Sequence, residues 1–446
     1  MNTPIVDFVR QYAAGGTARL HMPGHKGVSA LGCEPLDITE VAGADDLFHA
    51  EGVIAESERN AAALFGAGAT LYSTEGATLP IKTMLALAVQ NAPKTRTRPR
   101  ILATRNAHRS FLYGCALLDI EVDWLYGESA HLCACRVSAE ALEKTLADAA
   151  EPYCAVFVTS PDYLGNLLDI AALSHVCRAH GVPLLVDNAH GAYTAFSHTV
   201  CHPIALGATM CADSAHKTLP ALTGTAYLHI AKDAPAAFFE GARQAMALFA
   251  SSSPSYLLLQ SLDLCNAYLA NEFPAQLADC TARVFALKEL LVSLGYELLG
   301  NEPLKITVDG RARGYAGEAL ASALREGGVE PEFADRDCVV LMCTPRNTDE
   351  ELSRVALALC ALPARESLSK TDTVMPHNAE RALSIREAIL AAQQRIPVEN
   401  AEGRICAAPC VSCPPAIPIA VSGERITREH ITLFKAYGIE EIDVVK

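Results

Sequence analysis

Two side chains that follow apolar segments are of types that could together do covalent chemistry on a carbonyl compound. Asp187 ends the buried-strand pattern Pro183–Asp187, and Lys217 lies in a small, hydroxyl-rich turn after the apolar stretch Ile204–Cys211. In open α/β sheets, ligands bind at the carboxyl ends of the strands. A lysine there can form a Schiff base when burial or nearby positive charge promotes loss of its proton. Taken singly, Asp187 is also explained as a helix-capping acid, and Lys217 as a solvated lysine.

The pair indicates pyridoxal phosphate (PLP), which needs both a lysine and an acid. The acid lies opposite the pyridine nitrogen and keeps it protonated, so that the ring can accept electrons. PLP also needs a phosphate site, and Leu71–Thr78 is a strand that runs into a glycine turn before a helix opens at Leu79-Pro80. Backbone N–H groups at such a helix start bind anions, although a glycine turn of this kind is more often structural. Glu75 is awkward beside a phosphate, so its side chain is expected to point away.

A third candidate follows another predicted strand end. His108 lies in Arg105–Ser110, and an aromatic ring at this level could stack on the face of the pyridine. The alternative is a structural loop histidine. Elsewhere, Cys406, Cys410 and Cys413 include a C-x-x-C pair that could bind zinc, but no fourth ligand is near in the sequence and the following Pro-Pro explains the loop. No metal is expected.

These residues need a scaffold, and the first 230 residues alternate between β-rich and helical patterns. The strands are expected at Arg100–Thr104, Glu121–Tyr126, Cys154–Thr159 and Pro183–Asp187. The helices between them are expected at Leu79–Gln90, Ser138–Ala150 and Asp169–His180. Alternation of helices with wholly apolar strands predicts an α/β fold with a mainly parallel sheet that is covered on both faces.

A second, smaller α/β unit follows a long helical stretch at residues 241–295. Its strands are expected at Leu304–Val308 and Cys338–Cys343, and its helices at Tyr315–Arg325, Thr348–Leu362 (with a capping box at Thr348–Glu351) and Asn378–Gln394. Pro397–Pro418 is too rich in proline for regular structure. The predicted domains are therefore residues 1–295, a large PLP-binding domain, and residues 296–446, a small C-terminal α/β domain.

Composition excludes several classes of protein. The 446 residues include 36 Lys and Arg against 51 Asp and Glu, a net charge of −15, which argues against binding of nucleic acid through its phosphates. No apolar run of about 18 residues predicts a membrane helix, and the N-terminus does not resemble a signal peptide. The 16 cysteines are scattered through apolar stretches. They are therefore expected to be reduced thiols of a cytoplasmic protein.

Several motifs spread along nearly the whole chain resemble one family, the bacterial ornithine/lysine/arginine decarboxylases. These are PLP enzymes of the aspartate-aminotransferase fold. The motifs are Leu20-His-Met-Pro-Gly-His-Lys-Gly27, Asp45-Asp-Leu47 with Gly52-Val-Ile54, Arg105–Ser110, Asp187-x-Ala-His190, Ser214-x-His-Lys217, Glu402–Cys406 and Pro414–Pro418. The first motif and the PLP attachment motif Ser214–Lys217 are together specific.

The resemblance implies a role for each matching residue. Lys217 forms the Schiff base, Asp187 pairs with the pyridine nitrogen, His108 stacks on the ring and His190 lies beside the cofactor. The phosphate contacts are implied for Ser214, His216, Gly76, Ala77 and Thr78. His25 and Lys26 lie in a segment that closes over the active site in the family. Ser251–Tyr256 resembles a segment that reaches the neighbouring subunit's site, which implies a homodimer or higher homo-oligomer with shared active sites.

The chain also departs from the family pattern. It lacks the N-terminal receiver-like wing domain of the large inducible members and looks like the shorter, wingless branch, which resembles biosynthetic arginine decarboxylases. Asn188 stands where relatives often carry Glu or Ser, Asp162 replaces a more usual Thr, and Thr223–Thr225 differs from the better-known members.

The resemblance implies PLP-dependent decarboxylation of a basic L-amino acid to CO₂ and an amine of polyamine biosynthesis. Arginine is favoured over lysine and ornithine. The alternatives are an aminotransferase or a β-eliminating lyase of the same fold, and a non-catalytic paralogue, against which the presence of Lys217, Asp187 and His108 argues. The sequence identifies neither the pocket for the far end of the substrate nor the donor of the proton to Cα, for which His190 and a partner-subunit residue are candidates.

Overall fold

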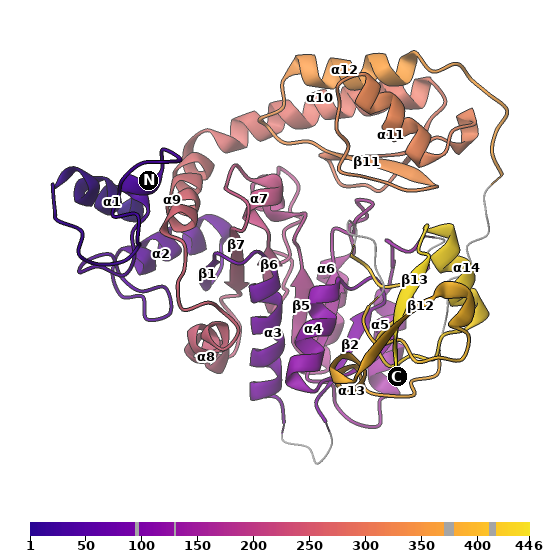
Figure 1. The fold of residues 1–446 in the computed structure, drawn as a ribbon, viewed down its shortest axis with the longest axis horizontal. Coiled ribbons are helices and arrows are strands. Elements are labelled where there is room, and N and C mark those ends of the chain that lie inside the picture. The colour runs from indigo at the N-terminus through magenta and orange to yellow at the C-terminus, as the bar shows by residue number, and fades with distance from the viewer. Residues whose placement is uncertain (94–97, 129–130, 370–378, 410–415) are drawn as a thin grey trace. The chain divides into compact units, whose positions relative to one another are not determined.

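The computed structural model describes residues 1–93, 98–128, 131–369, 379–409 and 416–446. The chain forms two compact units, one of residues 1–93 and 170–276 and the other of residues 94–169 and 277–446 (Figure 1). The predicted domains, 1–295 and 296–446, stay a prediction. Within the described residues, no helix is both long and apolar enough to span a membrane.

The first unit is built on four strands in the order β1-β7-β6-β5. These are β1 (Ala69–Ser73), β5 (Leu184–Asp187), β6 (Met210–Asp213) and β7 (Ala226–Ile230). β5 and β6 run parallel, whereas β7 is antiparallel to both of its neighbours. Every residue of β5, β6 and β7 is buried, as their continuous apolar patterns require.

Helices and 3₁₀ turns make up the rest of the regular structure described in this unit. They are α1 (Pro4–Ala14), α2 (Val53–Phe65), α3 (Thr78–Asn91), α6 (Ile170–Ala179), α7 (Ala215–Thr218), α8 (Ala236–Ala247) and α9 (Tyr256–Asn271), with the 3₁₀ turns η1 (Glu34–Leu36) and η2 (Ala192–Phe196). α3 packs on β6, β7 and α8 (Figure 1). α2 begins where the backbone N–H groups of Gly52 and Ile54 donate to the Asp45 carboxylate at 2.8 and 3.0 Å. The Asp45–Ile54 motif therefore has a structural role at a helix start.

The second unit contains a parallel set and an antiparallel sheet. The parallel set has the order β4-β2-β3 and consists of β2 (Arg100–Thr104), β3 (Glu121–Leu125) and β4 (Ala155–Thr159), with α4 (Arg109–Leu118) and α5 (Ala139–Ala147). The antiparallel sheet has the order β10-β11-β9-β8 and consists of β8 (Glu297–Leu299), β9 (Lys305–Asp309), β10 (Phe333–Ala334) and β11 (Cys338–Met342). It carries α11 (Gly317–Glu326), α12 (Asp349–Cys360) and η3 (Arg311–Arg313), and α10 (Phe273–Ser293) precedes it.

The C-terminal part of this unit adds a two-stranded ribbon. It consists of β12 (Gln393–Pro397) and β13 (Glu441–Val445), with α13 (Ile385–Leu390), η4 (Val398–Asn400) and α14 (Arg428–Ala436). Ile396, Cys406, Phe434 and Val444 share one buried cluster. This cluster also includes Ile419, so the residues just after the proline-rich segment are part of a core.

Most predicted elements are confirmed within one or two residues, including the capping box of α12. The helix predicted over Asn378–Gln394 is wrong. Residue 378 lies outside the described residues, α13 begins only after the capping residue Ser384, and Ala391 is already extended. Gln393–Pro397 then pairs with β13. A distant strand therefore fixes a conformation that the local pattern did not indicate.

Candidate active site

A lysine and a histidine face each other at the carboxyl ends of two neighbouring strands. Lys217 lies on the short helix α7, which follows β6, and His190 lies in the tight turn that follows β5. Because β5 and β6 are parallel neighbours, their ends meet at one edge of the sheet. The Nζ atom of Lys217 is 2.9 Å from Nε2 of His190. An ammonium group at this distance donates to a neutral imidazole, so the pair can exchange a proton.

Asp187 ends β5 and is 3% exposed. Burial raises the pKa of its carboxyl group to about 6, against the opposing effect of the nearby positive charge of Lys217. The backbone N–H of Ala189 donates to its Oδ1 at 3.2 Å. A carboxyl group with this pKa takes up and releases a proton near neutral pH, which suits an acid that shares a proton with a ring nitrogen.

The predicted phosphate turn precedes α3. Gly76 has φ +64, and Ala77 is the N-cap of α3 without a side-chain capping bond. The N–H of Gly76 itself donates to the carbonyl of Gly224 at 2.7 Å. This leaves the helix start at Ala77 and Thr78 as the better anion site. The Glu75 carboxylate accepts a bond from the backbone N–H of Ser251 at 2.6 Å.

His216 lies close to this turn, and Ser214 precedes that histidine by two residues in the chain. An added Cβ on Gly76 would lie 4.0 Å from Cε1 of His216. Nδ1 of His216 donates to the carbonyl of Thr225 at 2.8 Å, and burial lowers the pKa of its imidazole. Ser214 caps α7 without a side-chain capping bond. The roles of both residues in phosphate binding stay predictions.

His108 belongs to the second unit, where it is the N-cap of α4. Its Nδ1 accepts a bond from the backbone N–H of Ser110 at 3.1 Å. The neighbouring Arg105 donates to the carbonyls of Pro418 and Ile419, each at 2.8 Å. Two segments that carry the family resemblance, Arg105–Ser110 and the C-terminal proline motif, are thus held together. Stacking of His108 on a cofactor stays a prediction.

Residues at which this chain departs from the family pattern make hydrogen bonds within the protein. The buried Asp162 accepts bonds from the backbone N–H groups of Leu164 and Asn166, each at 2.9 Å, so it closes a turn. Asn188 donates from Nδ2 to Oδ1 of Asp213 at 2.7 Å. The Thr225 hydroxyl donates to the carbonyl of Leu222 at 2.7 Å.

Sequence reasoning missed a buried polar cluster around Asp213, the last residue of the strand before Lys217. Oδ2 of Asp213 lies 3.0 Å from Nε2 of His202 and 3.3 Å from Nε2 of His229. The sequence does not reveal this cluster, because it depends on how β6 and β7 pair. Cys211 and Asp213 are two residues apart on β6, and His229 is the β7 partner of Cys211. Candidate metal-ligand atoms of His202, Cys211 and Asp213 all lie within 4.8 Å of one another, as do those of a second group, His131, Asp335 and Cys338.

The group of Cys406, Cys410 and Cys413, which the sequence does not favour as a metal site, is only partly described. The Cys406 thiol donates to the carbonyl of Ala408 at 3.2 Å. Cys410 and Cys413 lie outside the described residues.

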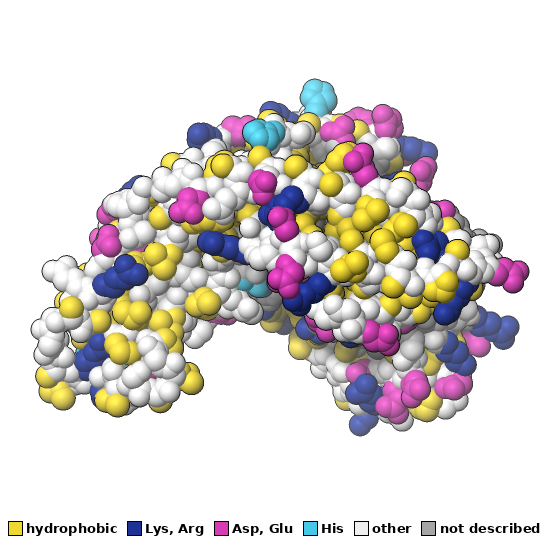
Figure 2. Space-filling model, turned by 90° about the horizontal axis from the view of Figure 1, so that it is seen from above, with side chains coloured by type: hydrophobic (Ala, Val, Ile, Leu, Met, Phe, Trp, Pro, Cys, Tyr) yellow, Lys and Arg dark blue, Asp and Glu magenta, His cyan; other side chains and the backbone are white. Residues whose placement is uncertain are grey.

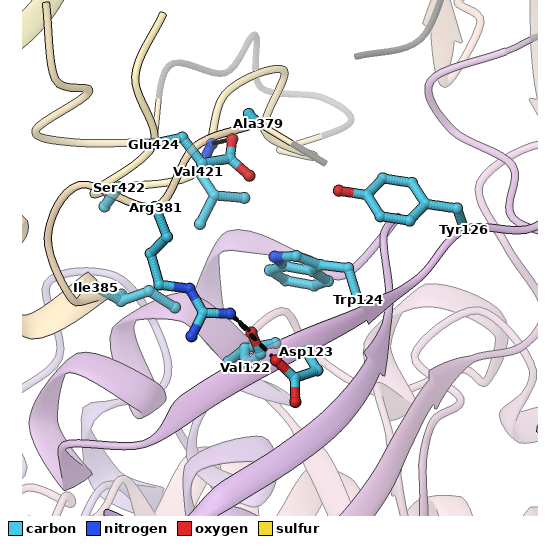
Figure 3. A pocket seen from close by; sticks show the side chains of 10 residues that line it. All are labelled: Val122, Asp123, Trp124, Tyr126, Ala379, Arg381, Ile385, Val421, Ser422 and Glu424. Carbon is cyan, nitrogen blue, oxygen red and sulfur yellow. Dashed lines mark hydrogen bonds and ion pairs between the residues drawn. The ribbon is translucent and has the colours of Figure 1, made fainter. Parts of the chain in front are cut away.

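The second unit also contains a cavity of about 550 Å³ beside β3 (Figure 3). The side chains of Trp124, Tyr126 and Glu424 border it. Its charged groups are paired with the protein: Arg381 contacts Asp123 at 3.3 Å, and Glu424 lies 3.8 Å from Arg105. The cavity therefore presents no charge that requires a ligand.

Comparisons with known proteins agree with these motifs. The family model for the major domain of Orn/Lys/Arg decarboxylases matches residues 3–299, and the model for the C-terminal domain matches residues 366–439. The Bacillus subtilis protein YaaO is 30% identical, with 97% of this chain and 93% of that protein covered. Arginine decarboxylases of Halalkalibacterium halodurans and Bacillus subtilis are 28% and 26% identical, each again with 97% of this chain and 93% of the relative covered.

Solved structures show the same fold. The constitutive lysine decarboxylase of Escherichia coli has a TM-score of 0.79 at 17% identity, covering 100% of this chain and 82% of that chain. Serine palmitoyltransferase of Sphingomonas wittichii has a TM-score of 0.57 at 16% identity, covering 80% and 82%. The predicted α/β fold of the aspartate-aminotransferase type is confirmed. By its sequence along both matched domains, this chain belongs to the Orn/Lys/Arg decarboxylase family.

Proposed function

We propose that this protein decarboxylates a basic L-amino acid with PLP bound at Lys217, and that arginine is the preferred substrate over lysine and ornithine. The observation that carries the proposal is the contact of Lys217 with His190 beside the buried Asp187, in a chain of this family. Arginine is favoured because relatives that match nearly the whole chain are named arginine decarboxylases.

The residues present fit PLP. A lysine amine, a buried carboxyl group with a pKa near 6 and a helix start without a side-chain cap lie in the same unit. When bound, PLP supplies an electron sink for the bond that breaks at Cα. Lys217 would hold the cofactor, Asp187 would hold a proton at the ring nitrogen, and Ala77, Thr78, Ser214 and His216 would hold the phosphate with Gly76 shaping the turn. His108 would stack on the ring.

His190 has a distinct part in this scheme. Its Nε2 can accept a proton from Lys217 and return it, because the two atoms are 2.9 Å apart. His190 is therefore the candidate within this unit for moving a proton near Cα. The protein selects the bond that breaks by orienting the substrate.

The setting of the enzyme is part of the proposal. We infer a cytoplasmic homodimer with shared active sites that serves polyamine biosynthesis. The 14 cysteines of the described residues form no disulfide, which suits a reducing compartment. Leu20 and Leu31, in and just after the first family motif, are 96% and 89% exposed, and a partner subunit would cover such side chains.

The test is product identification. Purified protein with PLP is incubated separately with arginine, lysine and ornithine, and the amine and CO₂ are quantified. Agmatine with an equal amount of CO₂, and the highest kcat/KM for arginine, are the expected results. Lys217→Ala should abolish both products, whereas the exposed Lys232→Ala serves as the matched control. Accumulation of a keto acid without CO₂ from any of the three would overturn the proposal in favour of an aminotransferase.

A further inference from the structure

A fully buried carboxylate ends the strand that leads to Lys217. Asp213 is the last residue of β6, is 0% exposed and precedes Lys217 by four positions. Its Oδ1 accepts a bond from Nδ2 of Asn188 at 2.7 Å, and its Oδ2 lies 3.0 Å from Nε2 of His202. Nε2 of His229 is 3.3 Å from the same oxygen. Three polar side chains therefore converge on one acid.

The sheet register brings these groups together. Cys211 and Asp213 are two apart on β6, so they share a face, and His229 on β7 is the partner of Cys211. Thr70 on β1 is in turn the partner of His229, and its Oγ1 lies 2.8 Å from Nδ1 of that histidine. The contact with Thr70 thus orients the His229 imidazole so that its Nε2 faces Asp213.

The protonation state of the acid follows from these contacts. Burial alone would raise the pKa of Asp213, but the charge and hydrogen bond of His202, with His229 close to the same oxygen, hold the pKa well below its usual range. The carboxylate is therefore an acceptor only. An amide at this position would put an N–H group against a donor.

Asn188 connects this acid to the segment that carries His190. The backbone N–H of Asn188 donates to the carbonyl of Ala212 at 3.0 Å, and the N–H of Gly191 donates to the carbonyl of Asn188 at 2.8 Å. His190 follows Asn188 by two residues. The side-chain bond from Asn188 to Asp213 therefore cross-links the two segments that present His190 and Lys217 to each other.

We propose that the Asn188–Asp213 hydrogen bond, anchored by His202 and His229, is a positioning link that sets the 2.9 Å contact between His190 and Lys217. This inference rests on the proposed function, because it concerns the same pair. In this proposal Asn188 and Asp213 act through the segments that carry His190 and Lys217, not as chemical participants. Their role is to hold the two turns in one arrangement.

Exchange of the two side chains tests the link. Asn188→Asp places a second carboxylate against Asp213, and Asp213→Asn removes the acceptor. The double exchange, Asn188→Asp with Asp213→Asn, restores one donor and one acceptor across the same gap. If the bond is a positioning link, the double variant should recover most of the kcat that each single variant loses. The effects of the two substitutions would then be coupled and not additive.

Two readouts separate positioning from general stability. The first is the pH at which the visible absorbance of the bound cofactor changes, measured without amino acid. The second is kcat against KM for the amino acid that is turned over. Each single variant should shift the absorbance midpoint and lower kcat roughly tenfold with little change in KM. The double variant should return toward the parent in both. The control Asp263→Asn, at a buried acid under α1, should change stability and leave the midpoint unchanged.

Three outcomes would overturn the link: unchanged single variants, a double variant as impaired as the two single losses combined, or a stoichiometric metal ion in the parent that Asp213→Asn loses. The metal result would make the cluster a metal site. Because the absorbance midpoint needs no substrate, it tests the link even when none of the three amino acids releases CO₂, which would count against the proposed function alone.

Discussion

At the scale of single residues, the candidate site combines a close lysine–histidine contact with a carboxyl group whose pKa burial has raised. Lys217 and His190 share a short contact, and Asp187 has a pKa near 6 because it is buried. Lysine and aspartate at the ends of apolar segments could be recognised from the sequence, since residue type and position carry the signal. His202 and His229 could not, because their relation to Asp213 exists only after β6 and β7 have paired.

The first residue-scale prediction concerns the attachment point. Borohydride reduction of the PLP-loaded protein, followed by proteolysis and mass spectrometry, should place the pyridoxyl group on Lys217. The reason is its position beside His190, which can take up its proton. Lys232, an exposed lysine of the same unit, should stay unlabelled. A label confined to another lysine would show that the assignment is wrong.

The second concerns Asp187→Asn. An amide cannot hold a proton at the ring nitrogen, so kcat should fall roughly a hundredfold or more. Cofactor occupancy, measured by absorbance after gel filtration, should fall much less because the substitution leaves the proposed phosphate contacts unchanged. A variant with near-normal kcat would exclude Asp187 as the partner of the ring.

At the scale of elements, helix starts are held by distant carboxylates as well as by local caps. The N-cap of α1, Thr3, makes no side-chain capping bond. Instead Asp263 on α9 accepts bonds from the backbone N–H groups of Ile5 and Val6 at 2.9 and 3.1 Å. Local caps such as those of α5 and α12 could be predicted from Ser138 and Thr348. A cap supplied from 258 residues away could not, because no local pattern encodes it.

Asp263 gives a prediction about pH. Burial raises the pKa of its carboxyl group to about 6, above the value of about 4 in an unfolded chain. The folded state therefore binds the extra proton, and the contribution of this group to stability is full below about pH 4 and is lost as the pH rises through about 6. Asp263→Asn should remove this loss. Relative to the parent, its free energy of unfolding should gain roughly 1–3 kcal/mol between pH 4 and pH 7.

Urea unfolding at both pH values measures this difference. The exposed Asp148→Asn is the control, for which no such relative gain is expected. A parallel pH dependence of Asp263→Asn and the parent would show that Asp263 titrates normally in the folded protein.

At the scale of the whole molecule, charge and exposed apolar residues bear on assembly. Acidic and basic side chains are interspersed with apolar ones on the face drawn in Figure 2. The net charge of −15 can be read from the sequence, but the exposure of leucines such as Leu20 and Leu31 cannot. Which of the apolar residues stay uncovered depends on the fold.

Shared active sites can be tested by complementation. Lys217→Ala and a triple alanine replacement of Ser251–Ser253 should each be inactive as homodimers. Mixed dimers should regain part of the activity, because one of the two sites then combines an intact lysine with an intact serine segment. Activity is compared with the fraction of mixed dimers, measured by native mass spectrometry of differently tagged subunits. Mixed dimers without activity would argue that each site is built from one subunit.

The hydrogen bond from Gly76 to the carbonyl of Gly224 has a consequence for cofactor exchange. It fastens the turn before α3 to Thr223–Thr225, the loop in which this chain differs from better-known relatives. Gly224 has φ +98, and an added Cβ would lie 3.2 Å from Leu258 and 3.4 Å from the carbonyl of Thr74. Substitution there would disturb this hydrogen bond and, with it, the helix start proposed to hold the phosphate. The divergent loop would then govern how long PLP resides on the enzyme, leaving the choice of amino acid to other residues.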